Sequence, residues 1–282
     1  MKENKYDDNI FFQKYSQMSR SQQGLAGAGE WETLRKLLPD FKDKRVLDLG
    51  CGYGWHCIYA MEHGASSVVG VDISHKMLEV AKEKTHFPQV EYKCCAIEDV
   101  EFPEESFDVI LSSLAFHYVA DYEILVKKIY RILKSGGKLV FTVEHPVFTA
   151  YGTQDWHYNE KGEILHFPVD NYYYEGKRTA VFLGEKVTKY HRTLTTYLNT
   201  LLSNGFIITS NPQPIGFSGI LLAKRQNSFY CTYFLHNRNV ADTKSPYPIK
   251  RLEVIRWFNQ KSMVFNQSPC LRRKKNTSSC RP

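Results

Sequence analysis

Short apolar runs alternate with longer amphipathic runs through most of the chain. Runs of strand length occur at 46–49, 67–71, 90–94, 107–112, 138–143 and 206–209. Between them, apolar residues recur at helical spacing in 55–63, 74–84 and 122–133. Strands that alternate with helices predict βαβ units. The pattern therefore predicts an α/β fold with a mostly parallel central sheet and helices on both faces.

Two further helices are expected outside this alternation. Residues 24–38 carry apolar residues at helical spacing and stop at Pro39, and residues 187–202 are amphipathic and stop before Gly205. The stretch 147–187 is rich in Trp, Tyr and His and is interrupted by Gly, Pro and Asn. Such a stretch is too aromatic for a linker, and it predicts a cover over a binding site.

A glycine-rich turn follows the first predicted strand directly. The sequence RVLDLGCGYG ends at Gly54, and a helix-like run begins at Trp55. A turn of this kind lets a ligand's polar groups approach exposed backbone N–H groups. The second strand ends in Asp72, 22 residues after Gly50. A carboxylate at this distance can accept hydrogen bonds from ribose hydroxyls.

The spacing of the glycines separates two classes of cofactor. A dinucleotide site needs G-x-G-x-x-G, whereas this turn reads Asp48-x-Gly50-x-Gly52-x-Gly54. A carboxylate at 48 would repel a pyrophosphate and suits a cationic ligand that carries an amino acid. The segments VLDLGCGYG and GVDIS resemble motif I and the acidic end of strand 2 in class I S-adenosylmethionine-dependent methyltransferases. The segments EHPVFTA, YHRTLTTY and LLSNGF are similar to the small-molecule, ubiquinone-biosynthesis-like group of that family.

This resemblance covers about residues 1–210 and implies a Rossmann-like class I methyltransferase fold with S-adenosylmethionine as cofactor. It divides the chain into N-terminal lid helices (1–40), a cofactor-binding core (41–146), a substrate-cover insertion (147–187), the last helix and strands of the core (188–225), and an atypical basic tail whose composition allows disorder (226–282). The sequence after Ser210 departs from the family's pattern. The final antiparallel strand is therefore doubtful, with 217–223 as its candidate and the fifth strand at risk of forming a bare edge.

The resemblance also implies which residues form the cofactor site. They come from the turn, the end of the second strand, the adenine-binding turn and the loop after the fourth strand: Asp48, Gly50, Cys51, Gly52, Tyr53, Gly54, Asp72, Ile73, Met77, Ala96, Ile97, Glu98 and Ser113. Many relatives have an acid at the position of Ala96, so Ile97 and Glu98 are the candidates for adenine contacts. Tyr15 and Arg20 are expected to close over the methionine end, with Arg20 on its carboxylate. Lid packing without ligand contact is the alternative.

Two histidines stand where a general base would be useful. His117 and His145 follow the fourth and fifth strands, at the sheet edge where ligands bind in open α/β folds, and each can titrate near neutrality. The resemblance favours His117. The alternative for each is a histidine that is merely hydrogen-bonded into this edge. His191 and Arg192, expected on the long helix 187–202, suit contacts to substrate or to the cover better than chemistry.

The excess of positive charge lies in the C-terminal part of the chain. The net charge is +7, but residues 226–282 hold 11 Lys and Arg against two acids, or +9. Residues 1–225 therefore carry 26 basic against 28 acidic residues, or −2, which does not indicate nucleic-acid binding. The seven cysteines lack metal-site spacing and indicate free thiols of a reducing cytoplasm, so no metal is expected. No apolar run is long enough to span a membrane.

Three functions remain open. The first is a cytoplasmic methyltransferase that acts on an O-, N- or C-nucleophile of a small molecule. The second is a protein or nucleic-acid methyltransferase, which is disfavoured because SSLAFHY stands where an Asn/Asp-Pro-Pro-Tyr motif would follow the fourth strand. The third is a cofactor-binding protein that is impaired in catalysis. A dinucleotide oxidoreductase has the wrong glycine pattern, and the oligomeric state is not indicated.

Overall fold

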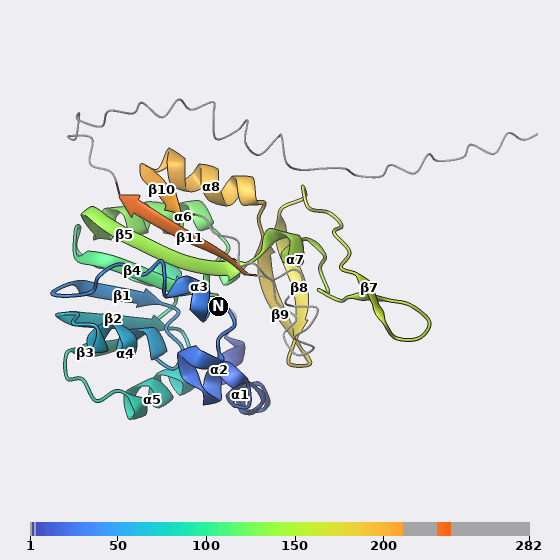
Figure 1. Ribbon diagram of the computed structural model, residues 1–282, viewed down its shortest axis with the longest axis horizontal. Coiled ribbons are helices and arrows are strands. Elements are labelled where there is room, and N and C mark those ends of the chain that lie inside the picture. The colour runs from blue at the N-terminus through green and yellow to red at the C-terminus, as the bar shows by residue number, and fades with distance from the viewer. Residues whose placement is uncertain (1, 3, 211–229, 238–282) are drawn as a thin grey trace, which may run out of the picture. The chain divides into compact units, whose positions relative to one another are not determined.

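A seven-stranded sheet organises the chain in the computed structural model, which describes residues 2, 4–210 and 230–237 (Figure 1). The strand order is β10-β11-β5-β4-β1-β2-β3. Its members are β1 (Arg45–Leu49), β2 (Ser67–Asp72), β3 (Val90–Cys94), β4 (Phe107–Ser113), β5 (Leu133–Glu144), β10 (Phe206–Ser210) and β11 (Tyr230–Asn237). The five strands β1 to β5 pair in parallel, whereas β11 pairs antiparallel with both β5 and β10.

Helices cover both faces of this sheet, and consecutive side chains of each strand point to different clusters. In β1, Val46 packs with Trp31 of α3 (Trp31–Leu34), with α4 (Trp55–Glu62) and with α5 (His75–Lys84). The next residue, Leu47, packs with α6 (Tyr122–Ile132) and α8 (Leu194–Ser203) on the opposite face. Side chains on both faces of the sheet are therefore covered by helices. Polar groups can gather only at the ends of the strands.

The N-terminal segment and the region after β5 form smaller elements. The first are η1 (Lys5–Asp7), α1 (Asn9–Ser16), α2 (Ser19–Gln22) and η2 (Gly24–Gly27), and the connections of the sheet contain η3 (Ile97–Asp99) and η4 (Phe116–Tyr118). After β5 follow α7 (Pro146–Ala150) and two separate antiparallel pairs, β6 (His157–Tyr158) with β7 (Ile164–His166) and β8 (Gly176–Phe182) with β9 (Glu185–His191).

Two predicted helices are shorter than expected. Residues 24–38 form the short η2 and α3, and 187–202 begin as the strand β9 before α8 starts at Leu194. The buried residues of β9 alternate, with Val187, Lys189 and His191 buried and their neighbours less so. Leu183 and Gly184 both have positive φ, which matches the two-residue hairpin turn that joins β8 to β9.

The antiparallel strand that the sequence left in doubt is present as β11. It pairs with β5 from Glu144 to Lys138, so β5 is not a bare edge. The candidate strand at 217–223 and most of the basic tail lie outside the described residues.

Candidate cofactor and acceptor site

A cavity of about 560 Å³ opens at the carboxyl ends of β1, β2, β4 and β5. The lining comes from the glycine turn with the ends of β2, β4 and β5, from the segments that carry η3 and η4, from the N-terminal segment and from the β8–β9 hairpin. Of the predicted site residues the structure brings together Tyr15, Arg20, Gly50, Cys51, Gly52, Tyr53, Asp72, Ile73, Met77, Ala96, Ile97, Glu98, Ser113 and His117. Asp48, Gly54 and His145 do not line the cavity.

The glycines of the turn have different tasks. All three have positive φ. A Cβ on Gly50 would lie 2.5 Å from the Ala115 Cβ, and one on Gly54 would lie 2.2 Å from the Tyr92 hydroxyl oxygen, so both sites need the space. A Cβ on Gly52 would meet nothing within 4 Å among the described atoms. Gly50 and Gly54 therefore permit close packing, and Gly52 presents bare backbone to the cavity.

Asp72 organises the turn from the end of β2. Its carboxylate accepts hydrogen bonds from the backbone N–H of Gly52 and of Ser74, each at 2.9 Å. The two hydrogen bonds favour the ionised carboxylate, but burial has the larger effect and raises the pKa of Asp72. The same carboxylate thus fixes the glycine turn and lines the cavity.

Asp48 is placed differently from the sequence expectation. Its side chain is 1% exposed, behind the turn, and Oδ2 accepts a hydrogen bond from the Cys57 Sγ at 3.6 Å. Burial raises the pKa of Asp48 to about 7. A carboxylate in this position does not face a ligand in the cavity, so its role as a direct partner of a cationic ligand is a correction to the sequence analysis.

The N-terminal segment is fastened over the cavity at several points. Asp7 accepts hydrogen bonds from the Ser74 hydroxyl (2.6 Å) and from the backbone N–H of Lys76 (3.1 Å), and so caps the first turn of α5. The Asn4 side chain donates to the carbonyl oxygen of Ile73 at 3.1 Å. Tyr6 and Tyr15 of this segment line the cavity, and their ring centroids lie 5.3 Å apart.

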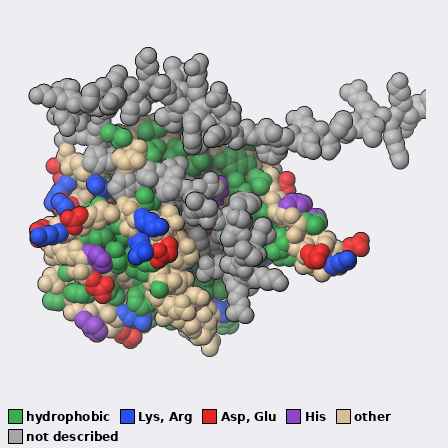
Figure 2. All heavy atoms as spheres, viewed as in Figure 1, with side chains coloured by type: hydrophobic (Ala, Val, Ile, Leu, Met, Phe, Trp, Pro, Cys, Tyr) green, Lys and Arg blue, Asp and Glu red, His purple; other side chains and the backbone are tan. Residues whose placement is uncertain are grey.

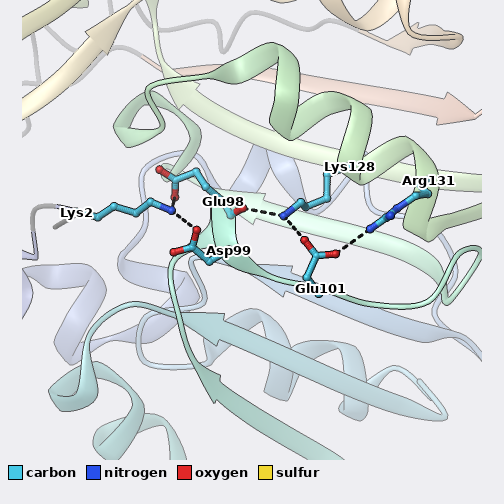
Figure 3. Close-up of polar contacts among 6 residues, drawn as sticks. All are labelled: Lys2, Glu98, Asp99, Glu101, Lys128 and Arg131. Atoms are coloured by element: carbon cyan, nitrogen blue, oxygen red, sulfur yellow. Dashed lines mark hydrogen bonds and ion pairs between the residues drawn. The ribbon is translucent and has the colours of Figure 1, made fainter.

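Figure 3 shows how η3 is held from two sides. Lys2 reaches both acidic side chains, with its Nζ 2.6 Å from Asp99 and 3.8 Å from Glu98. From α6, Lys128 donates to the carbonyl oxygen of Glu98 and to the carboxylate of Glu101, each at 2.8 Å. These contacts fix the segment that carries Ile97 and Glu98 along the cavity.

His117 and His145 are both poor proton acceptors near neutral pH. His117 is 1% exposed, and its Nδ1 accepts the backbone N–H of Glu144 at 3.4 Å. His145 caps α7, where its Nδ1 accepts the backbone N–H of Val147 at 3.1 Å. Burial lowers the pKa of each to about 4. The expectation that they titrate near neutrality is therefore wrong, because burial removes the solvation that stabilises the imidazolium.

A buried ion pair stands beside His117. Glu144 at the end of β5 lines the cavity and lies 2.6 Å from the Lys189 Nζ of β9. Gln154 bridges the two, because its amide donates to Glu144 at 2.9 Å and its carbonyl accepts from Lys189 at 3.0 Å. Burial by itself raises the pKa of Glu144, but the charge of Lys189 and the hydrogen bonds from Lys189 and Gln154 together oppose it. The pKa is therefore lowered and the carboxylate is ionised.

Comparison with known proteins identifies the family. Residues 47–141 match the methyltransferase domain family. A solved structure from Listeria monocytogenes, assigned as an S-adenosylmethionine-dependent methyltransferase, is 51% identical, with a TM-score of 0.70, over 75% of this chain and 99% of that one. The chain belongs to the S-adenosylmethionine-dependent methyltransferases. A methyltransferase of the same kind from Mesorhizobium loti is 35% identical, with a TM-score of 0.69, over 76% and 100% of the two chains.

The predicted fold class, family, enzyme class and cofactor of this methyltransferase are confirmed. A ubiquinone biosynthesis O-methyltransferase from Coxiella burnetii is 36% identical over 112 residues, which are 39% of this chain and 47% of that protein. Within the described part of the chain, no helix is long and apolar enough to cross a membrane. The same residues contain no cluster of three or more His, Cys, Asp or Glu that could hold a metal ion.

His191 and Arg192 of the methyltransferase lie outside the cavity lining, at the end of β9 and in the connection to α8 rather than on one long helix. The His191 ring joins the Thr149 hydroxyl and the carbonyl oxygen of Tyr172, both at 2.8 Å. Arg192 donates to the carbonyl oxygen of Ala120 at 2.8 Å. His191 thus contacts the cover, whereas Arg192 contacts the segment before α6.

Sequence reasoning missed Glu30, Glu144 and the β9 residues of the methyltransferase. Lys189 and Glu144 are 45 residues apart in sequence, and Glu30 is ten residues from its partner Arg20. The buried positions of EKVTKYH include Lys189 and His191, so no alternation of apolar residues marked β9 in the sequence. Nothing in the local sequence marks Glu30 as buried.

Proposed function

We propose that this chain transfers a methyl group from S-adenosylmethionine to a small-molecule acceptor that binds beneath the β8–β9 hairpin. The observation that carries the proposal is the continuity of one cavity from the glycine turn and Asp72 to His117, Glu144 and Tyr190. Its volume of about 560 Å³ lies in the range typical of small-molecule sites. The similarity to the ubiquinone biosynthesis O-methyltransferase supports an acceptor of this class.

The side chains and backbone groups that line the cavity fit the cofactor. The open space over Gly52 admits the ligand to the backbone, and the Asp72 carboxylate suits ribose hydroxyls. Ile73, Met77, Ala96, Ile97 and Glu98 give the walls for adenine, and Ser113, Tyr15 and Arg20 face the amino-acid end. Bound there, the cofactor supplies an electrophilic methyl group on a sulfonium. Asp48 and Gly54 support the turn from behind.

In this proposal His117 orients the acceptor as a hydrogen-bond donor. Its Nδ1 accepts the Glu144 N–H, so the proton of the neutral ring is on Nε2. His117 can therefore donate to an electronegative atom of the acceptor. Holding the reactants in line accounts for a large part of the barrier reduction in such displacements, of order 7–11 kcal/mol in favourable cases.

The surface is consistent with a small acceptor. Basic and acidic side chains of the described residues are intermingled on the face in Figure 2. Residues 1–225 carry a net charge of −2, so the body of the enzyme gives little electrostatic attraction to nucleic acid.

The first experiment is calorimetric titration of the full chain with S-adenosylmethionine, S-adenosylhomocysteine and NAD. We expect micromolar binding of the first two and none of NAD. Labelled cofactor would then be incubated with fractionated extracts, and label is expected in the small-molecule fraction. A folded chain that does not bind S-adenosylmethionine, or label confined to protein or RNA, would refute the proposal.

A further inference from the structure

A buried carboxylate stands behind the lid side of the cofactor cavity. Glu30, the residue before α3, is 2% exposed. Its Oε1 accepts a hydrogen bond from the Arg20 guanidinium at 2.5 Å and one from the Ser113 hydroxyl at 3.1 Å. Arg20 and Ser113 both line the cavity. Glu30 therefore contacts two cavity residues from the protein side.

Burial of this carboxylate is expensive in free energy. A buried ionised group is tolerated only where charges and hydrogen bonds compensate it. The second oxygen of Glu30, Oε2, is buried and has no hydrogen-bond partner among the described residues. An apolar side chain would fill the same space without this cost. Stability alone thus does not account for Glu30. We therefore look for its role in the contact with Arg20.

Glu30 also connects the lid to the ends of the central strands. The Ser113 hydroxyl that donates to Glu30 lies 3.4 Å from the Thr142 Oγ1, which in turn accepts the backbone N–H of Leu114 at 3.0 Å. Leu114 lines the cavity and has a φ of 55°, a conformation that needs support in a residue with a branched side chain. One chain of contacts therefore runs from Arg20 to the strained backbone after β4.

The backbone that carries Arg20 is closely packed. A Cβ on Gly27 of η2 would lie 2.2 Å from the carbonyl oxygen of Ser19, so η2 lies directly against the start of α2. The remaining freedom of Arg20 is in its side chain, whose exposure is 22%. The guanidinium has five N–H donors in a fixed plane, and the donor that Glu30 engages sets the orientation of that plane.

We propose that Glu30 is a positioning residue for cofactor binding. It orients the Arg20 guanidinium toward the α-carboxylate of the methionine part, and it links this group to Ser113. The inference rests on the proposed function, because it assigns the Arg20 side of the cavity to the amino-acid end of S-adenosylmethionine.

The test is Glu30→Gln in the full chain, titrated with two ligands. S-adenosylhomocysteine carries the methionine-derived carboxylate, and 5′-methylthioadenosine lacks the amino-acid part. The amide keeps the size and one acceptor oxygen but removes the charge. We expect affinity for S-adenosylhomocysteine to fall about tenfold, as for loss of one charge-assisted hydrogen bond. Affinity for 5′-methylthioadenosine should change by less than about twofold, because no carboxylate contact is involved.

Glu32→Gln is the matched control. Glu32 lies two residues further along the chain, in α3, but is 71% exposed and pairs with Arg35 on the surface, so neither affinity should change. Arg20→Gln should reproduce the selective loss of the Glu30 variant. Equal weakening of both ligands in folded Glu30→Gln, or no weakening of either, would overturn the proposal. The unmodified chain is titrated first. If it does not bind S-adenosylhomocysteine, the proposed function itself is refuted.

Discussion

Removing the positive charge of Lys189 is expected to destabilise the fold strongly. The side chains of Lys189 and Glu144 are only 3% and 11% exposed, and their charged atoms lie 2.6 Å apart. Lys189→Met keeps the length of the side chain and its packing near the Phe182 ring, over which the ammonium lies at 5.6 Å. The substitution leaves the Glu144 carboxylate buried without its cation, a change that typically costs about 3–5 kcal/mol.

The double variant tests whether charge is the cause. In Lys189→Met with Glu144→Gln, the buried charge is gone and Gln154 can still hydrogen-bond to the new amide. Replacing both members of a buried pair is often nearly neutral, so most of the lost stability should return. Lys127→Met, which breaks the exposed pair with Glu123 at 2.7 Å, is the control and should cost less than about 1 kcal/mol.

Urea unfolding followed by circular dichroism measures these differences, and pH adds a further check. In the native chain the lowered pKa of Glu144 contributes stability above its unfolded pKa, which is lost as the pH falls through the folded value. In Lys189→Met, the lowering effect of the ammonium on this pKa is lost and burial is opposed less, so Glu144 binds a proton more readily. The deficit relative to the native chain should therefore shrink as the pH falls. A single variant within about 1 kcal/mol of the native chain, or a double variant no better than the single one, would refute the reasoning.

Three other substitutions or conditions probe the site. Asp72→Ala should weaken binding of S-adenosylhomocysteine by about 1–3 kcal/mol, the range for a hydrogen bond to a charged group, and unchanged affinity by calorimetry would remove Asp72 from the ribose site. His117 should not contribute a slope to the pH profile of kcat/KM between pH 6 and 8, because its ring gains a proton only as the pH falls through its pKa of about 4. A slope near neutrality that disappears in His117→Gln would contradict the burial of His117. Tyr190→Ala should raise the KM of the acceptor while cofactor affinity stays within about twofold, because its side chain lines only the hairpin side of the cavity; equal loss of both would show that the two sides are not separate.

The central sheet and the turn were predictable because their signals are local. Strand β1, its glycines and Asp72 lie within one βαβ unit, and the alternation of apolar runs is visible over the whole core. The secondary structure of the region after Glu144 was harder to predict from the sequence. In β9 the alternating residues lead directly into α8, and Tyr190 together with Leu194 and Tyr197 mimics helical spacing across the junction.

Long-range pairing explains the other differences. Strand β11 is recognisable only from its partner β5, about 90 residues earlier in the chain, and no local pattern specifies that register. The buried state of Asp48 likewise depends on Cys57 from the following helix. A motif and its resemblance thus predicted the family and 14 of the residues that line the cavity, whereas the direction in which Asp48 faces depended on packing.

The hairpin β8–β9 hydrogen-bonds as a sheet of its own, separate from the seven-stranded sheet. Thr188 and Tyr190 line the cavity, whereas the alternate residues Lys189 and His191 are buried and anchor the hairpin to Glu144 and Thr149. Mutations at the lining positions can accumulate without disturbing either the anchor or the glycine turn. If the acceptor binds beneath the hairpin as proposed, acceptor preference can diverge during evolution, or in directed selection of hairpin libraries, while the machinery for the methyl donor is inherited unchanged.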